Sequence, residues 1–391
     1  MRSCLAVTEE IYDIEKAADE LILKLDASIL DYSNKSGLLL CDYDYDVEQL
    51  SSILHKRLGF DIVGCTGIAM LSSHGVHEYA ASLTVFAGDD CYFSSVLSEP
   101  INSENYEEYL GNAYKKAKEA FGGEKPKFIY MMAPLVHDIS STKYYEVLDR
   151  YSDGVPIIGG VAMGNLDLAI GKIFLNGRMN SNSCAMLLMG GNINIYFAVE
   201  PLSQSFYEQH IITESRGNRV KTVNNIPVAE FLAGRGIDVK DQTSMLLTLF
   251  NVKLSKDSDI VCRLFTEFDS KTGEAKCTGD LPVGTIISGA LCKSADVGSS
   301  CDKLMQKLSD KIKEGKEDDC FTVLGISCSQ RYSIMGADKD VEFQSMSKFL
   351  PLNRVTLTSF YCLGEWCPIF YDGKKVNNMS HALTIAFCMV W

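Results

Sequence analysis

One unit of sequence occurs three times along this chain of 391 residues. Each copy has a short apolar run, then apolar residues at the spacing of an α-helix, then a second apolar run. In the first copy these segments are residues 38–41 (LLLC), a stripe within residues 47–58, and residues 62–66 (IVGCT). Because each copy must form the same strand, helix and strand, the repeat constrains the fold more than any other feature. The corresponding segments are residues 127–133, 144–151 and 155–161 in the second copy and residues 321–328, 343–350 and 355–362 in the third.

Two of the copies continue into a hairpin signal. The sequences IFLNG (173–177) and IFYDG (369–373) end in Asn-Gly and Asp-Gly, which strongly favour a tight turn between two strands. Each is followed, after a polar stretch, by a further apolar run at residues 184–189 or 382–390. A strand, a helix and a strand predict a right-handed parallel crossover, whereas the hairpins add antiparallel pairs. The predicted fold class is therefore α/β, with mixed sheets that stack and helices outside them.

The repeats also predict two domains of similar architecture. A partial fourth copy begins at residues 283–292, and a polar segment at residues 217–225 (GNRVKTVNN) separates two copies from the other two. We therefore place the boundary near residue 205, with an N-terminal domain of residues 1–204 and a C-terminal domain of residues 205–391. Each domain is expected to contain two repeats.

The charge and the cysteine content exclude several classes of function. The chain carries 37 Lys and Arg against 51 Asp and Glu, a formal charge of −14, and no basic patch reverses it. Such a surface repels nucleic acid and the anionic inner leaflet of a membrane. The sequence has neither an apolar run of membrane-spanning length nor the N-terminal pattern of a signal peptide. The 14 cysteines are scattered through apolar runs, as buried reduced thiols are, which indicates a cytoplasmic protein.

No familiar catalytic or cofactor motif occurs in the sequence. The patterns H-E-x-x-H, C-x-x-C and G-x-S-x-G are missing, and the glycines before Lys172 have the wrong spacing for a phosphate-binding loop. His74 and His77 are close in sequence, but a solvated turn explains that spacing better than a metal site. We therefore expect no metal site, no cofactor and no catalytic residue.

Small residues mark the end of the second strand in every copy. The segments are GCTG (64–67), GGVAMGN (159–165) and CLGE (362–365). Glycine lets another backbone or a ligand approach closely, and ligands of open α/β sheets collect beyond the carboxyl ends of the strands. These residues either line a ligand site or only relieve strain at a strand-to-hairpin corner, and the sequence leaves both interpretations open.

Two charged residues follow apolar strands of the third copy. Arg331 ends the sequence SCSQR, and Glu365 follows the sequence CLG. A guanidinium can grip a carboxylate with two hydrogen bonds, while a carboxylate can receive an ammonium group. The pair therefore predicts a clamp for an α-amino acid, floored by Cys328 and Gly364. In the alternative interpretation, Arg331 and Glu365 form a structural salt bridge with each other.

The order of these motifs resembles the FIST family. The resemblance rests on GCTG, IIGGVAMGN, ESRGNRVKTVNNIPVAEFL (214–232), ISCSQR and LGEWCP, and it covers residues 35–391. It implies paired FIST N and FIST C domains, the sensory domains of bacterial signalling proteins, with amino acids or similar metabolites as ligands. Since family members are often joined to kinases or other output domains, it also implies a signalling partner such as a kinase acting in trans.

Three functions remain open at this point. The first is a cytoplasmic sensor that binds a small molecule and is not an enzyme, with neither nucleic acid nor membrane as a partner. The second is a protein-interaction adaptor. The third is a cysteine-dependent hydrolase that uses Cys328 or Cys65 as its nucleophile. The residues predicted to contact a ligand are Arg331, Glu365, Cys328, Gly364, Cys65, Thr66, Gly159 and Gly160.

Overall fold

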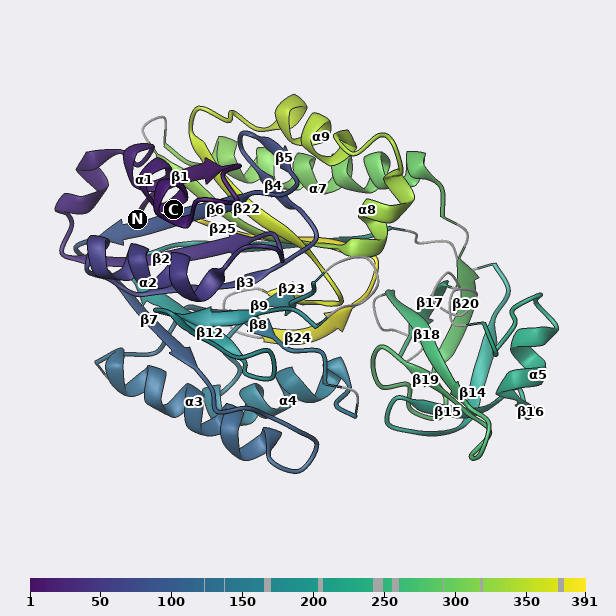
Figure 1. The fold of residues 1–391 in the computed structure, drawn as a ribbon. Helices are drawn as coiled ribbons and strands as arrows, with labels where there is room; N and C mark the ends of the chain where they lie inside the picture. Colours follow the sequence, from purple (N-terminus) through teal and green to yellow (C-terminus); the bar gives the residue numbers. More distant parts are fainter. Residues whose placement is uncertain are drawn as a thin grey trace.

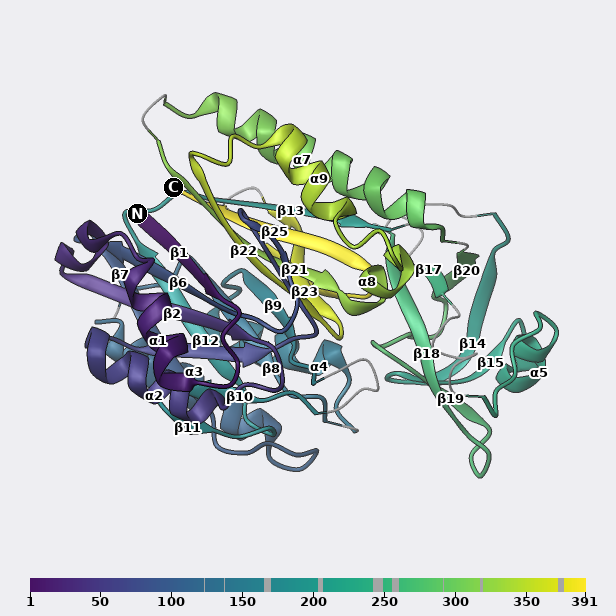
Figure 2. The ribbon, with the colours of Figure 1, turned by 45° about the horizontal axis from the view of Figure 1, so that its top comes forward.

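The computed structural model contains three six-stranded sheets and one seven-stranded sheet, with helices packed against them (Figure 1). It describes residues 1–122, 124–136, 138–164, 170–202, 207–241, 249–254, 260–290, 292–316, 319–371 and 376–391. The six-stranded sheets, named I, II and III below, form one layered body, and the seven-stranded sheet lies to one side of it (Figures 1 and 2). Among the described residues, no helix is both long enough and apolar enough to cross a membrane.

The first two repeats have the same order of elements. Each begins with an edge strand and a helix, continues with a strand, a helix and a strand, and ends with a hairpin and a return strand. The first repeat contains β1 (Arg2–Thr8), α1 (Ile14–Leu23), β2 (Asn34–Cys41), α2 (Val47–Leu58), β3 (Ile62–Thr66), β4 (Met70–Ser72), β5 (Gly75–His77) and β6 (Ala81–Gly88). The second contains β7 (Cys91–Leu97), α3 (Tyr106–Ala120), β8 (Phe128–Ala133), α4 (Ser141–Ser152), β9 (Ile157–Val161), β10 (Ile173–Leu175), β11 (Arg178–Met179) and β12 (Ala185–Gly191).

The third repeat keeps this order, except that two helices stand where the other repeats have their second helix, and it is interrupted after its edge strand. Its elements are β13 (Ile195–Pro201), α7 (Ser294–Glu314), β21 (Phe321–Cys328), α8 (Ser329–Met335), α9 (Val341–Phe349), β22 (Val355–Cys362), β23 (Glu365–Tyr371), β24 (Val376–His381) and β25 (Thr384–Val390). The seven-stranded sheet, called the inserted sheet below, lies between β13 and α7 in the chain. It contains β14 (His210–Arg216), β15 (Arg219–Val223), β16 (Ile226–Pro227), α5 (Val228–Ala233), β17 (Leu249–Lys253), β18 (Val261–Asp269), β19 (Glu274–Cys277) and β20 (Ile286–Ala290).

The local sequence patterns predict many of these elements correctly. β3, β21 and β22 begin and end where the apolar runs do, and α2 spans the predicted stripe. The Asn-Gly hairpin signal is confirmed, because Asn176 and Gly177 have φ angles of 53° and 85° in the turn between β10 and β11. The Asp-Gly signal falls outside the described residues. The pairs β2–β3, β8–β9 and β21–β22 are parallel and stand beside antiparallel neighbours, so the sheets are mixed, as predicted.

Each repeat places its hairpin in the sheet of another repeat. Sheet I has the strand order β1-β6-β2-β3-β10-β11, sheet II β7-β12-β8-β9-β23-β24, and sheet III β13-β25-β21-β22-β4-β5. In every sheet the first four strands come from one repeat and the last two are the hairpin of a different repeat. The exchange is cyclic, since the first repeat completes sheet III, the second completes sheet I and the third completes sheet II. The three repeats are therefore related by a pseudo-threefold arrangement.

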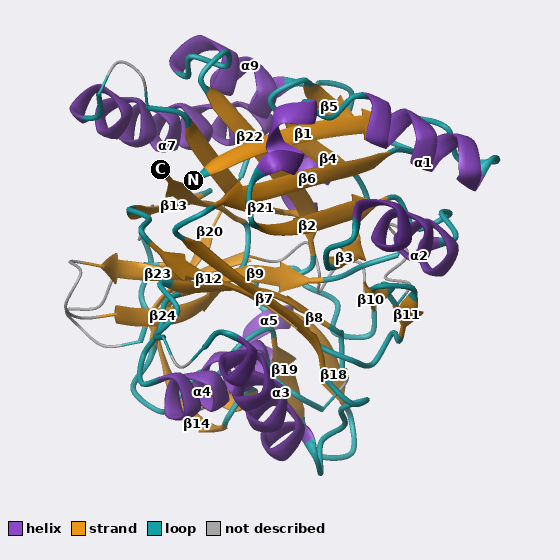
Figure 3. Ribbon diagram, turned by 90° about the vertical axis from the view of Figure 1, so that its left-hand side faces the viewer, coloured by secondary structure: helices purple, strands orange, loops and turns teal. Residues whose placement is uncertain are grey.

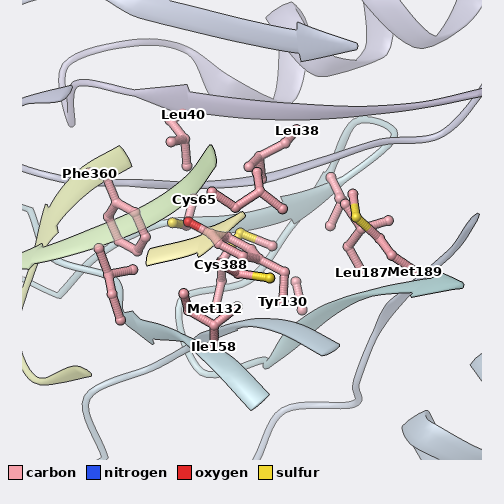
Figure 4. Close-up of a cluster of buried hydrophobic side chains, with 14 of the residues drawn as sticks. Leu38, Leu40, Cys65, Tyr130, Met132, Ile158, Leu187, Met189, Phe360 and Cys388 are labelled. Atoms are coloured by element: carbon pink, nitrogen blue, oxygen red, sulfur yellow. The ribbon is translucent and has the colours of Figure 1, made fainter. Parts of the chain in front are cut away.

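The three sheets enclose one apolar cluster and carry their helices on the outside, as predicted. This central cluster takes side chains from all three sheets, among them Leu40, Tyr130 and Phe360 (Figure 4). Helices α1 and α2 cover sheet I, α3 and α4 cover sheet II, and α7, α8 and α9 cover sheet III (Figures 1 and 3). Each of these three sets packs over its own apolar cluster. Strands buried on both faces need apolar side chains at successive positions, which explains unbroken runs such as LLLC at residues 38–41.

The inserted sheet corrects two of the sequence-based interpretations. The polar segment of residues 217–225 does not separate two pairs of repeats, because it contains β15, on which Val220 and Val223 are buried between more exposed polar residues. The prediction of a fourth copy is also wrong. β20 pairs with β14 and β17 in the inserted sheet, and α7 precedes β21 as α1 precedes β2 and α3 precedes β8. The chain therefore contains three copies of the unit among its described residues.

Strand pairs cross the boundary that the sequence predicts at residues 204 and 205. β4 pairs with β22, β9 pairs with β23, and β13 pairs with β25. A division into residues 1–204 and 205–391 therefore separates strands that are hydrogen-bonded to each other.

The cyclic arrangement predicts that the chain tolerates circular permutation. Short turns join β6 to β7 and β12 to β13, while β25 and β1, the third such pair, stand at the two ends of this chain. These ends lie side by side (Figures 1 and 2). A variant with a linker of about four residues from Trp391 to Met1 and new ends between Asp89 and Asp90 should be as stable as the parent within about 2 kcal/mol. Urea unfolding measures this difference.

A permutant opened between Leu39 and Leu40, inside β2, is the matched control. It should not fold, because the cut breaks a strand that is paired on both sides and buried. Failure of the Asp89–Asp90 permutant to fold would contradict the cyclic arrangement of the repeats.

Candidate functional site

The three sheets share one structural position at the start of the hairpin strand. In each sheet, the carbonyl oxygen of the residue before the hairpin strand accepts a hydrogen bond from an N–H near the end of the neighbouring strand. That neighbour is β22, β3 or β9, and it belongs to a different repeat from the hairpin. Ala69 accepts from Tyr361 at 3.1 Å, Lys172 from Thr66 at 3.0 Å, and Gly364 from Val161 at 3.1 Å. The residues that follow these three acceptors are Met70, Ile173 and Glu365. Met70 and Ile173 belong to the central cluster, so the third repeat has a carboxyl where the other two bury an apolar side chain.

Glu365 is fully buried at this position. Its Oε1 lies 4.0 Å from Sγ of Cys362, and its Oε2 has no hydrogen-bond partner among the described residues. Burial raises the pKa of Glu365 to about 8, although the nearby Cys328 thiol, neighbouring backbone N–H groups and the positive charge of Arg331 oppose the shift. The carboxyl is therefore mostly protonated at neutral pH.

Cys328 lies beside this carboxyl at the end of β21. Only 2% of the residue is exposed, and burial together with the charge of Glu365 raises the pKa of its thiol well above the usual value. The thiol of Cys362, the register partner of Cys328 on β22, is shifted in the same direction. A thiol that stays protonated is a poor nucleophile, so the surroundings of Cys328 do not favour cysteine-dependent hydrolysis.

Arg331 makes its ion pair with Glu342. Arg331 lies on α8 and is fully buried, and its Nε donates to Oε1 of Glu342 at 2.7 Å. Nη1 donates to Oγ of Ser300 at 3.0 Å, and Nη2 donates to the carbonyl oxygen of Val297 at 3.3 Å. Since every nitrogen of the guanidinium is engaged, Arg331 ties α8 to α7 and α9.

This pairing corrects the predicted clamp. The sequence places Arg331 and Glu365 on one ligand or in one salt bridge, but the structure gives Arg331 a different acid, 11 residues further along the chain. The reason is topological, because α8 turns Arg331 outward to the helices that cover sheet III while β23 carries Glu365 into sheet II.

Cys65 and Thr66 connect the first two repeats at the end of β3. Both are fully buried. Oγ1 of Thr66 donates to the carbonyl oxygen of Met163 at 2.9 Å and accepts from the N–H of Lys172 at 2.9 Å. Cys65 belongs to the central cluster, and burial raises the pKa of its thiol well above the usual value (Figure 4). These contacts give both side chains a structural role.

Gly159 and Gly160 let other atoms pack closely against β9. A Cβ on Gly159 would stand 1.8 Å from the carbonyl oxygen of Met131, and one on Gly160 would stand 2.4 Å from Sγ of Cys362. No side chain fits at either distance, so close packing accounts for both glycines.

Gly364 differs from these two glycines. It is partly exposed, as is Leu363, and a Cβ at Gly364 would meet only the carbonyl oxygen of His381, at 4.0 Å. The surface of the protein therefore reaches the residue directly before Glu365. Of the predicted residues, the structure brings together Cys328, Gly364, Glu365 and Gly160, and it gives Arg331, Cys65, Thr66 and Gly159 contacts elsewhere.

Sequence reasoning found Glu365 but missed its most informative property. A residue-by-residue comparison of the three hairpin starts, Met70, Ile173 and Glu365, would have shown one acid against two apolar residues. No comparable signal marks Glu342 as the partner of Arg331. Within the described part of the chain, no cluster of His, Cys, Asp and Glu is arranged to hold a metal ion.

Matches to two domain models define the class of this protein as a paired sensory module. The FIST N domain matches residues 35–226 and the FIST C domain matches residues 228–368. The chain therefore belongs to the FIST family, whose domains are sensory domains in signal transduction. The two matched ranges meet at Pro227, inside the inserted sheet.

Other comparisons add little. A solved structure described as cyanuic acid hydrolase from A. caulinodans has a TM-score of 0.41 and 8% sequence identity, and the match covers 100% of this chain and 99% of that chain. A similarity at this level carries no argument about the chemistry of this chain. No curated protein matches the sequence.

The contacts of Arg331 predict a loss of stability when it is replaced. Arg331→Ala leaves the Glu342 carboxylate buried without its cation, and breaking a buried pair in this way costs roughly 3–5 kcal/mol. We expect the free energy of unfolding in urea to fall by that amount. Arg57→Ala, at an arginine with two surface ion pairs, is the control and should cost about 1 kcal/mol or less. A cost for Arg331→Ala as small as that of the control would contradict the structural role.

The raised pKa of Glu365 predicts a fall in stability as the pH rises. Because the folded-state value of about 8 exceeds the value of about 4.3 in an unfolded chain, the folded state holds the proton more tightly. The stability contributed by the protonated carboxyl is complete below about pH 4 and is lost as the pH rises through about 8, a total on the order of 3–5 kcal/mol. Glu365→Gln should remove this fall, as measured by urea unfolding between about pH 5 and 9.

Cys362→Ala is the matched control for this experiment, since it alters the neighbour at 4.0 Å and keeps the carboxyl. Its stability should fall with pH as the parent's does. Parallel pH profiles for the parent and Glu365→Gln would show that Glu365 is not protonated in the folded state at neutral pH.

Proposed function

We propose that this protein is a cytoplasmic sensory module that binds a small ligand next to Glu365 and is not an enzyme. The carboxyl itself carries the proposal: it is fully buried, and among the described residues its Oε2 has no partner. The same position holds Met70 and Ile173 in the other repeats, so an apolar side chain is enough to fill the space there. An unsatisfied buried polar group costs stability, and a ligand that completes its hydrogen bonding explains why it is present.

The ligand we favour is an amino acid or a related metabolite with a primary ammonium group. An ammonium donates to a carboxylate and supplies the positive charge that stabilises ionised Glu365. Because Glu365 holds a proton at neutral pH, binding of an ammonium should expel that proton. We propose that the ligand approaches from the side of Leu363 and Gly364, which are partly exposed. With Arg331 engaged by Glu342, other donors have to receive the carboxylate of such a ligand.

We further propose a signalling protein, such as a kinase acting in trans, as the partner that receives the signal. Membership in a family of sensory domains supports this proposal. The charge of −14 disfavours nucleic acid and anionic membranes as partners. The cytoplasmic location is supported by the cysteines, all of which are free thiols and most of which are buried.

A thermal-shift screen of amino acids and central metabolites tests the proposal. A specific ligand at about 100 times its Kd should stabilise the protein by about 2.7 kcal/mol. Glu365→Gln should abolish the shift, whereas Cys362→Ala should keep it. Titration calorimetry of the identified ligand in two buffers with different ionisation enthalpies should detect the release of about one proton per ligand at neutral pH.

Two results would contradict the proposal. A ligand that stabilises Glu365→Gln as well as the parent binds elsewhere. If no compound in the screen stabilises the protein and a protein partner copurifies stably, the interaction adaptor becomes the better description.

A further inference from the structure

Arg263 is a buried cation at the junction between the inserted sheet and sheet II. It lies on β18, and only 2% of the residue is exposed. Its Nη1 donates to the carbonyl oxygens of Ser380, at 2.8 Å, and Cys262, at 2.9 Å, and its Nη2 donates to Oγ of Ser380 at 3.2 Å. Burial lowers the pKa of Arg263, as expected for a guanidinium whose hydrogen-bond partners are neutral. The inserted sheet thus contains a buried charge whose hydrogen bonds reach Ser380 in sheet II.

That residue lies next to the candidate site. Ser380 is on β24, where it pairs with Trp366 of β23, and the next residue, His381, pairs with Glu365. The ring Nε2 of His381 lies 2.9 Å from the carbonyl oxygen of Cys367, which fixes β24 against β23. Arg263 therefore holds the hairpin that carries Glu365, at the rung directly beside it.

A second connection to the inserted sheet starts from β23 itself. Nε1 of Trp366 donates to the carbonyl oxygen of Ser141, in the first turn of α4, at 2.8 Å. Oγ of Ser141 donates to the carbonyl oxygen of Thr278 at 2.6 Å, and Oγ of Ser140 donates to Oδ1 of Asp280 at 2.6 Å. Thr278 and Asp280 follow β19 in the inserted sheet. The direct neighbour of Glu365 is thus connected to the inserted sheet through the start of α4.

We infer that the position of the inserted sheet against sheet II is coupled to protonation and ligand binding at the Glu365 site. Arg263 is the positioning residue that carries this coupling. The contacts across the junction are directional hydrogen bonds, which respond to small displacements of β23 and β24. A ligand that moves the start of β23 changes the geometry at Ser380 and Ser141, and so shifts the inserted sheet. Because coupling between two sites is reciprocal, the inserted sheet in turn tunes the site. The inference rests on the proposed function for its role in signalling.

Hydrogen–deuterium exchange of the whole chain tests the coupling without a ligand. The reporters are the amides of Thr278 and Leu281, both hydrogen-bonded within the inserted sheet. Glu365→Gln should change their exchange rates by about fivefold or more, the lower end of measured couplings. Ile173→Val, at the equivalent position of the second repeat, is the matched control and should change them less than about twofold. Rates in Glu365→Gln that equal those of the parent overturn the inference.

Arg263→Lys supplies the reciprocal measurement. Lysine keeps the positive charge but cannot make the forked contact with Ser380. The midpoint of the Glu365 titration, followed by carbon NMR of its carboxyl, should move by about half a pH unit or more, a factor of about three in the proton equilibrium. The groups that face Glu365, which are Cys328, Cys362, Arg331 and His381, are all retained in this variant.

An unchanged midpoint in Arg263→Lys means that Arg263 does not position the site, and it overturns that part of the inference. If Arg263→Lys does not fold, Ser380→Ala takes its place, because it removes the contact of Arg263 to Oγ and keeps the contact to the carbonyl oxygen of Ser380. The midpoint of the Glu365 titration should then also differ from that of the parent. A ligand screen without hits would remove the proposed function and leave the exchange result standing. An unchanged exchange rate beside a confirmed ligand would remove the coupling alone.

Discussion

The exchange of hairpins between repeats is the constraint on which the rest of the structure depends. No repeat completes its own sheet, because β4 and β5, β10 and β11, and β23 and β24 each form the far edge of another repeat's sheet. The three sheets must therefore assemble together, and their inner faces form one central cluster. The same exchange places the ends of β3, β9 and β22 beside the starts of hairpins that come from other repeats. Glu365 lies at the start of one of these hairpins.

The pseudo-threefold arrangement makes the departure at Glu365 meaningful. Symmetry assigns the same environment to Met70, Ile173 and Glu365, and that environment is apolar. An acid placed there loses its hydration, and among the described residues the charge of Arg331, which is paired with Glu342, only partly offsets that loss, so burial dominates its pKa. The inserted sheet is the second departure from symmetry, and it contacts the hairpin that contains the first, through Arg263 and Ser380. These two departures from symmetry are therefore neighbours.

Local sequence patterns predict the strands and helices of the three repeats, but they do not predict which strands pair with each other. The runs that form β3, β21 and β22 are apolar because both faces of those strands are buried, and this property is visible in a short window. Pairing is not visible in such a window: β10 follows β9 in the chain yet pairs with β3, joined by a Lys172–Thr66 contact across 106 residues. For the same reason the sequence predicts a separating segment at residues 217–225 and a fourth copy at residues 283–292, where the structure has strands of the inserted sheet.

The two buried acids of the third repeat show what separates a structural charge from a functional one. The carboxylate of Glu342 accepts hydrogen bonds from Nε of Arg331 at 2.7 Å, Oγ of Ser327 at 3.2 Å and Oη of Tyr361 at 2.9 Å. Its charge is therefore matched and its oxygens are satisfied. Such a network stabilises one packing of α8 and α9 and leaves nothing for a ligand to add. Glu365 is equally buried, but its Oε2 is left without a partner among the described residues, and its contacts with thiols are weak. Stability alone would favour methionine or isoleucine at that position, as the other two repeats have, so the carboxyl is better explained by what it binds than by what it packs against.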